Sequence, residues 1–182
     1  MTLSYPTDLS DDQWELLLGL LPSAKPGGRP RSVDVRAIVN AIFYIVVAGC
    51  AWRMLPKDLP KWKTVYHYFR AWRLDGTWER DHTQLVQWER VMQGREAAPS
   101  AASLDSQSVK SATPAALEVG FDGGKKIKGR KRHLMVDTLG LVMMVVVTAA
   151  NVSDQQGARR IFKRLSELPE RIARLVLIWV DG

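Results

Sequence analysis

The chain has 182 residues, of which 46% are hydrophobic and 25% are charged, and its formal net charge is +7. This length and composition allow one medium or two small domains with a hydrophobic core, and they exclude a disordered chain, a collagen and a coiled coil. The excess of Lys and Arg, together with 7 Trp residues, favours a polyanionic partner for a folded protein.

Cys50 is the single cysteine of the sequence, so an internal disulfide is excluded, and the three scattered His residues cannot complete a zinc cluster with it. We expect Cys50 to be a buried structural thiol. The first residues lack the basic segment and apolar run of a signal peptide. The longest apolar stretches, 37–52 and 139–150, are shorter than the roughly 18 residues that span a bilayer. The sequence therefore predicts a cytoplasmic protein without a membrane segment.

The first half of the chain has the spacing of short helices. Ser10 and Gln13 form a capping box, and the apolar residues from Trp14 to Leu21 follow at helical intervals until Pro22 and a Pro-Gly-Gly turn at 26–28. A second helix, capped by Ser32, should be largely buried because it is apolar on most sides. Its expected end is Gly49.

A third helix is expected from near Pro60 to the Asp-Gly turn at 75–76, and a fourth from about Thr77 to Gln93. Short helices joined by tight turns can form a helix-turn-helix-like domain. The third helix carries basic residues that could face DNA phosphates, namely Lys61, Lys63, Arg70 and Arg73. The alternative is a solvated basic face over an aromatic core, and the spacing alone leaves both open.

The segment 94–100 is small and polar, as expected of a linker between domains at 1–93 and 101–182. After it, the hydrophobic pattern predicts strands over 101–109, 130–137 and 141–149. A helix opened by Ser153 and closed by Pro169 follows, and then a continuous apolar run over 174–180, typical of a strand buried on both faces. The fold class is therefore α+β or α/β, with a helical domain first.

Two acidic residues stand where a carboxylate needs a partner. Asp105 lies inside the first predicted strand and Asp181 directly follows the last one. Carboxylates on neighbouring strands can hold Mg²⁺, and two such ions can activate a nucleophile and stabilise the leaving oxygen of a phosphodiester. The alternative is that each Asp only caps a turn.

A basic run over 125–132 follows the flexible-looking Asp-Gly-Gly at 122–124. Beside a carboxylate pair it would bind a phosphate backbone with strong salt dependence. The alternative is a solvated surface tract. Its basic residues are Lys125, Lys126, Lys128, Arg130, Lys131 and Arg132.

The segments 124–141 and 147–154 closely resemble the transposases of bacterial insertion sequences with an Asp-Asp-Glu (DDE) catalytic triad. The first half of the chain is similar to the small N-terminal domain of the same transposases. The segments that carry this second similarity are 9–14, 28–30, 49–53 and 62–66.

The resemblance implies an RNase H-like catalytic core, in which the first and fourth strands lie side by side. It places the family's first Asp at Asp105 and its second at Asp181, both as catalytic metal ligands for Mg²⁺ or Mn²⁺. By its position at the end of a predicted strand, Asp137 is assigned to the following turn, and Asp154 is assigned to the start of the next helix. The implied activity is strand cleavage and transfer on the element's terminal inverted repeats and target DNA, by a homo-oligomer at the nucleoid.

The family's third acid, a Glu on a later helix, has no counterpart before Gly182. The expected catalytic core is therefore incomplete, and the chain is expected to be a transposase or the N-terminal part of one. The alternatives are a truncated, non-catalytic DNA-binding regulator and an inactive remnant.

Overall fold

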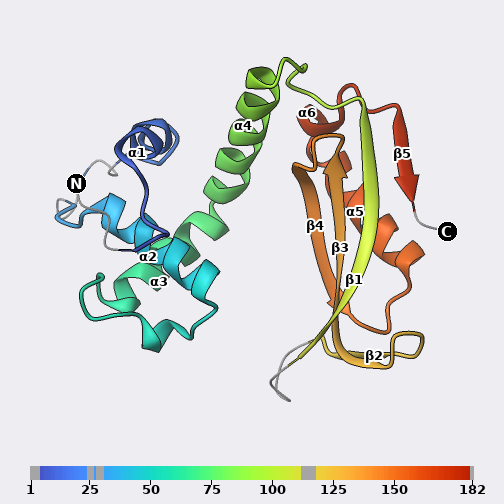
Figure 1. Cartoon of the computed structure of the whole chain (residues 1–182), viewed down its shortest axis with the longest axis horizontal. Coiled ribbons are helices and arrows are strands. Elements are labelled where there is room, and N and C mark those ends of the chain that lie inside the picture. The colour runs from blue at the N-terminus through green and yellow to red at the C-terminus, as the bar shows by residue number, and fades with distance from the viewer. Residues whose placement is uncertain (1–4, 24–26, 28–30, 112–117, 181–182) are drawn as a thin grey trace. The chain divides into compact units, whose positions relative to one another are not determined.

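The computed structural model describes residues 5–23, 27, 31–111 and 118–180 (Figure 1). The chain forms two compact units, Met1–His82 and Thr83–Gly182, and the division falls inside one helix. The first unit is helical and the second is built on a sheet. None of the helices in the described ranges is both long enough and apolar enough to cross a membrane.

The structure confirms the four helices predicted for the first half of the chain. They are α1 (Asp11–Leu18), α2 (Val35–Ala48), α3 (Trp62–Leu74) and α4 (Thr77–Met92), with a short 3-10 turn η1 (Trp52–Met54) between α2 and α3. The first helix ends at Gly19, before Leu21. Most of the predicted turn at 26–28 lies outside the described residues.

Local hydrogen bonds explain where two of these helices begin and end. The Gln13 backbone N–H donates to Ser10 Oγ at 3.2 Å, and the Gln13 side chain accepts from the Ser10 backbone N–H at 3.0 Å, which confirms the capping box. The predicted cap at Ser32 is wrong. Asp34 caps α2 instead, accepting from the Ala37 N–H at 3.2 Å, because it directly precedes the first helical residue. The helix ends at Gly49, whose φ of 65° suits glycine.

The core of the first unit lies between α2 and α3. Its buried side chains are Leu9, Ile38, Val39, Ala41, Ile42, Val65 and Trp72. The expected burial of α2 is confirmed for Val35 to Ile45, all buried or half-buried, but it is wrong for the last turn, where Val46 and Val47 are 69% and 73% exposed. Cys50 is half-buried and free, rather than buried as expected.

The second unit is a mixed sheet with helices against one face (Figure 1). β3 (Ile127–Asp137) pairs antiparallel with both β1 (Ala101–Lys110) and β4 (Val142–Ala149), and β1 pairs parallel with β5 (Leu177–Val180). The prediction that the first and last strands lie side by side is therefore confirmed. The helices are α5 (Asp154–Ser166) and the short α6 (Pro169–Ile172).

The structure corrects three expectations for the second unit. A strand that the pattern missed, β2 (Gly120–Asp122), pairs with the start of β3, so the basic run lies on a hairpin and not after a flexible loop. Pro169 begins α6, whereas α5 has already ended at Ser166. β5 is not buried on both faces, because Val180 is 61% exposed and only Ile178 packs against the core.

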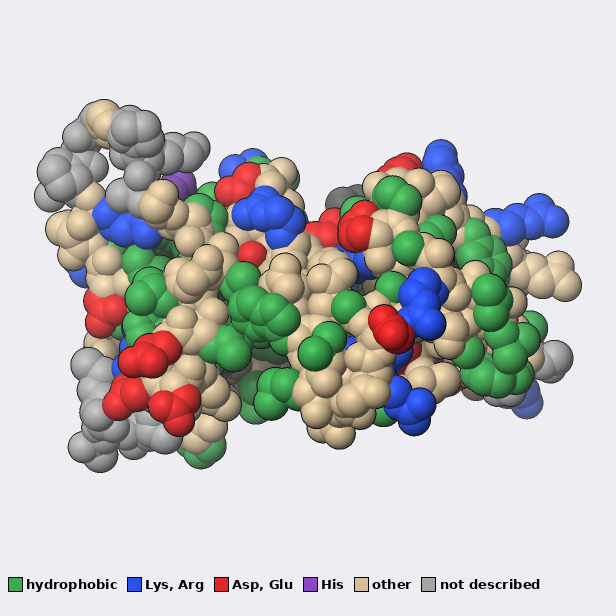
Figure 2. All heavy atoms as spheres, turned by 90° about the horizontal axis from the view of Figure 1, so that it is seen from above, with side chains coloured by type: hydrophobic (Ala, Val, Ile, Leu, Met, Phe, Trp, Pro, Cys, Tyr) green, Lys and Arg blue, Asp and Glu red, His purple; other side chains and the backbone are tan. Residues whose placement is uncertain are grey.

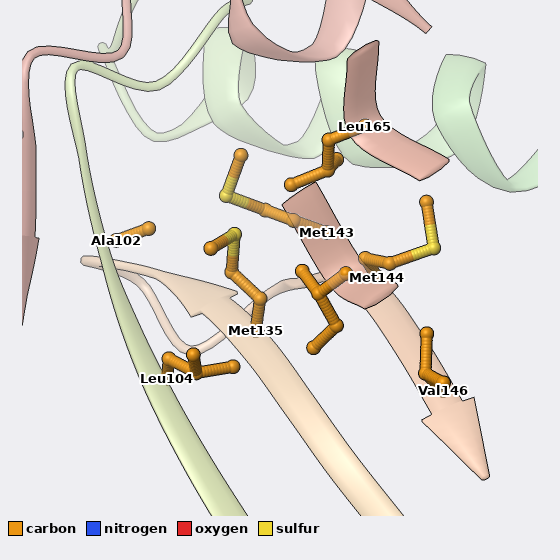
Figure 3. Close-up of a cluster of buried hydrophobic side chains, with 8 residues drawn as sticks. Ala102, Leu104, Met135, Met143, Met144, Val146 and Leu165 are labelled. Carbon is orange, nitrogen blue, oxygen red and sulfur yellow. The ribbon is translucent and has the colours of Figure 1, made fainter. Parts of the chain in front are cut away.

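The inner face of the sheet packs on α5 (Figure 3). Ala102 and Leu104 of β1 alternate with exposed neighbours, as a half-buried strand requires. The other buried members of this core are Met135, Met143, Met144, Val146, Ile161 and Leu165. Gly157 lets α5 approach the sheet closely, since a Cβ there would lie 2.0 Å from the His133 imidazole.

The last turns of α4 belong to the second unit because two buried arginines hold them. Arg90 forms a buried ion pair with Asp137, at the end of β3, and its Nε donates to the Glu96 carbonyl at 2.9 Å. Arg171 donates to the Met143 carbonyl at 2.8 Å and to Thr83 Oγ1 at 2.9 Å.

Asp137 closes the turn after β3, as expected. Its Oδ1 accepts the backbone N–H groups of Leu139 and Leu141, both at 2.9 Å. The sequence pattern did not identify its ion-pair partner, Arg90. This carboxylate therefore joins the β3–β4 turn to α4.

We expect Arg90→Met to lower the free energy of unfolding of the second unit by about 3–5 kcal/mol, because it leaves Asp137 buried without its cation. Urea unfolding followed by circular dichroism measures the change. Arg95→Met is the matched control, since the Arg95 side chain is exposed, and it should change stability by less than about 0.5 kcal/mol. Equal effects of the two substitutions would contradict this role for Arg90.

Candidate metal and nucleic-acid site

Asp105 stands on β1 just past the end of β5. It is exposed, and its Oδ1 accepts the backbone N–H of Ser106 at 2.6 Å. Its Oδ2 has no hydrogen-bond partner among the residues that the structure describes. One carboxylate oxygen is thus held by the backbone and the other is available to a ligand.

A cavity of about 760 Å³ opens beside Asp105. One wall is formed by β1 and the buried His133 of β3, and another by the first turn of α5. Lys125, from the turn before β3, lies at the same cavity. The lining residues are Leu104, Asp105, Ser106, Lys125, His133, Ser153, Asp154, Gln155, Ala158 and Val180.

The register of β5 against β1 bears on the second predicted acid. Leu104 pairs with Val180, so the residue before Asp105 lies opposite the last described residue of β5. Asp181 follows Val180 in the sequence and lies outside the described residues.

Asp154 does more than begin a helix. It is the first residue of α5, and its Oδ1 accepts from Ser106 Oγ at 2.7 Å and from Lys131 Nζ at 3.0 Å. The hydrogen bond from the Ser106 hydroxyl, followed by that from Lys131, holds the pKa of Asp154 below its usual value. The carboxylate therefore joins α5 to β1 and β3 at the cavity.

Asp122 is the second carboxylate beside Lys131. The Ser108 hydroxyl donates to its Oδ2 at 2.5 Å, and the backbone N–H groups of Gly124 and Lys125 donate to its Oδ1 at 3.1 and 3.0 Å. These bonds, the Ser108 hydroxyl first, lower the pKa of Asp122 to about 2. The Asp-Gly-Gly segment is thus an ordered turn.

The hairpin sorts the basic run into different surroundings. Lys125, Lys126, Lys128 and Arg132 are exposed, and Arg130 is half-buried. Lys131 is only 7% exposed and lies 3.0 Å from Asp154 and 3.6 Å from Asp122, which speaks against a phosphate contact by this side chain. The sequence signal for this difference is strand alternation.

His133 is a buried group that sequence reasoning did not select. Its Nε2 lies 3.0 Å from Thr148 Oγ1, and burial lowers the pKa of the imidazole. It lines the same cavity as Asp154. Across the described ranges, no three His, Cys, Asp or Glu residues group together as a metal site.

The predicted basic residues of the first unit lie at the surface. Lys63, His67 and Arg70 are exposed on α3 at intervals of three and four residues, which places them on one helix face. Lys61 and Arg73 are exposed at its two ends. On the face drawn in Figure 2, Lys and Arg side chains stand between acidic and hydrophobic ones instead of forming one continuous patch.

Two family profiles match the chain. One, described as "Putative transposase of IS4/5 family", matches residues 9–82, and the other, "Transposase DDE domain", matches residues 96–182. The chain belongs to the DDE-type transposases of insertion sequences. The first match ends at residue 82, where the two compact units divide, and the second begins at residue 96.

Two curated proteins are similar to this transposase. The insertion element IS402 uncharacterized 16.2 kDa protein of Burkholderia cepacia is 29% identical over 56% of this chain and 72% of its own length. The uncharacterized protein y4sN of Sinorhizobium fredii is 31% identical over 35% of this chain, and the match spans about half of its length (51%). No solved structure matches the chain.

We expect Asp122→Asn to destabilise the second unit at neutral pH, and the effect to fade as the pH falls through the range from about 4 to about 2. The pKa of Asp122 is lower in the folded chain than in the unfolded chain, so the ionised carboxylate stabilises the fold above this pH range. Protonation of Asp122 at lower pH removes that stabilisation. Urea unfolding of both proteins at several pH values measures the difference.

Ser108→Ala is the matched comparison, because it removes the hydrogen bond that contributes most to the lowered pKa of Asp122. In this variant, the pH range over which ionised Asp122 stabilises the fold should be narrower. A stability difference between the parent and Asp122→Asn that is as large in acid as at neutral pH would contradict the assignment.

Proposed function

We propose that the chain binds the end DNA of an insertion sequence and takes part in Mg²⁺-dependent strand cleavage and transfer, with Asp105 and Asp181 as metal ligands. The second unit would be an RNase H-like core. The observation that carries the proposal is the pairing of Leu104 with Val180, which brings together the strands that lead into the two acids.

The donors at the cavity fit a hard divalent cation. Asp105 offers a free carboxylate oxygen at the surface of a cavity that Ser106 and Asp154 also line. Asp181 follows Val180, the β5 residue paired with Leu104, in the sequence, and we propose it as the second ligand. Oxygen ligands of this kind suit Mg²⁺ or Mn²⁺.

The bound ions would supply Lewis-acid activation of the attacking oxygen and stabilisation of the leaving oxygen. The chain's own residues would orient the metal ligand Asp105 and hold the DNA backbone. Asp105 is fixed by the Ser106 N–H, and Lys125 stands over the same cavity with its Nζ 3.3 Å from the Ser106 carbonyl. Exposed Lys128 and Arg132 on the hairpin would hold the phosphate backbone.

We expect Asp105→Asn to lower the affinity of the full chain for Mn²⁺ by at least about tenfold and to abolish Mg²⁺-dependent nicking, while leaving DNA affinity nearly unchanged. Titration calorimetry with Mn²⁺ and a nicking assay on terminal-repeat DNA measure both effects. Glu167→Gln, at the exposed end of α5, is the matched control. Unaltered Mn²⁺ binding by Asp105→Asn would refute the metal assignment.

A second candidate is a DNA-binding regulator that does not cut. The observation that favours it is the exposed basic face of α3, which stands in the first unit, apart from the candidate metal ligands. Such a protein would shift terminal-repeat DNA in a gel and yield no Mg²⁺-dependent products.

We propose that α3 contacts DNA in both candidates. Arg70→Gln should weaken DNA binding and reduce the slope of log affinity against log salt concentration by about one, because one phosphate contact is lost. Arg164→Gln, an exposed arginine at the last turn of α5, removes the same charge elsewhere and should leave the slope unchanged. If both variants change the slope equally, α3 has no special place in DNA binding.

A further inference from the structure

Lys131 is the exception within the basic run. Its β1 partner is Ser108, and this register turns it toward the inner face of the sheet, whereas Lys128 is exposed. Its ammonium lies between the carboxylates of Asp122 and Asp154, at 3.6 and 3.0 Å. A buried cation with two carboxylate partners is a structural centre, because removing it would leave nearby negative charges without compensation.

Each of those two carboxylates also binds a serine of β1. Asp122 accepts from Ser108 and Asp154 accepts from Ser106, so Lys131 holds two neighbouring inward positions of the strand through its partners. Asp122 is the last residue of β2 and Asp154 is the first residue of α5. One ammonium of β3 therefore connects two further segments to the strand that carries Asp105.

The shortest of these connections leads directly to Asp105. Lys131 Nζ donates to Asp154 Oδ1, the same oxygen accepts from Ser106 Oγ, and the Ser106 backbone N–H donates to Asp105 Oδ1. The distances along this series are 3.0, 2.7 and 2.6 Å. Asp105, Ser106 and Asp154 all line the cavity.

We propose that Lys131 is a positioning residue that acts through Asp154 and Ser106 to fix the edge of β1 presenting Asp105 to the cavity. This inference rests on the proposed function of Asp105. It gives the one buried lysine of the basic run a task different from that of its exposed neighbours. The partners of Lys131 are carboxylates of the chain itself, whereas the exposed residues of the basic run would contact DNA phosphates.

The test is a double-mutant cycle on the full chain, with Mn²⁺ affinity as the readout. Lys131→Met should lower the affinity about tenfold, as loss of a group that orients a ligand does. Ser106→Ala should have a similar effect although it keeps the ion pairs of Lys131. In the Ser106→Ala background, Lys131→Met should add less than about twofold, because both substitutions break the same connection.

Lys131→Arg and Lys128→Met are the matched controls. The arginine variant keeps the cation and should restore most of the Mn²⁺ affinity, whereas Lys128→Met should leave it unchanged and instead reduce the salt dependence of DNA binding. Additive effects of Lys131→Met and Ser106→Ala, or an unchanged Mn²⁺ affinity in Lys131→Met, would overturn the proposal.

The amide resonance of Ser106 gives a readout that needs no metal. Because this N–H donates to Asp105 Oδ1, its chemical shift should differ from that of the parent chain in Asp105→Asn and in Lys131→Met. It should be close to the parent value in Lys131→Arg and unchanged in Lys128→Met. If the parent chain binds no Mn²⁺ but the shift follows this pattern, the proposed function fails and the positioning role stands. If the Ser106 amide shift is the same in Lys131→Met as in the parent chain, the positioning role alone is overturned.

Discussion

The alternation of β1 is the constraint on which the second unit depends. Leu104 must face α5 to complete the core, and the period of two then turns Asp105 outward. The strand pairs on one side with β3 and on the other with β5, and the last described pair with β5 is Leu104 with Val180. Asp105 therefore lies one residue beyond that pair, with its carboxylate beside the cavity.

Two buried cations hold the sheet at two positions along β3. Arg90 pairs with Asp137, the last residue of the strand, and Lys131, near its middle, lies between Asp122 and Asp154. Each pair joins the sheet to a helix that follows or precedes it in the sequence. Burial of such charges stabilises a fold only when every partner is in place, so these pairs favour one arrangement of the helices over others.

Each of the two family matches lies within one of the two compact units. The first unit presents an exposed basic helix face, and the second presents a carboxylate at a cavity with lysine nearby. Phosphate contacts fix the position of a protein on DNA, whereas chemistry requires oxygen ligands for a cation. Under the proposed function, DNA contact by α3 and metal chemistry at Asp105 would belong to separate units of the chain.

The sequence by itself determined the four N-terminal helices, the main strands, the turn role of Asp137 and the family, because capping residues, hydrophobic period and a long motif are local signals. It did not determine β2, the cap at Asp34 or which side chains of the basic run are buried. Only the tertiary structure decided that Lys131 faces inward to Asp122 and Asp154, because the partners of a buried charge come from segments distant in sequence.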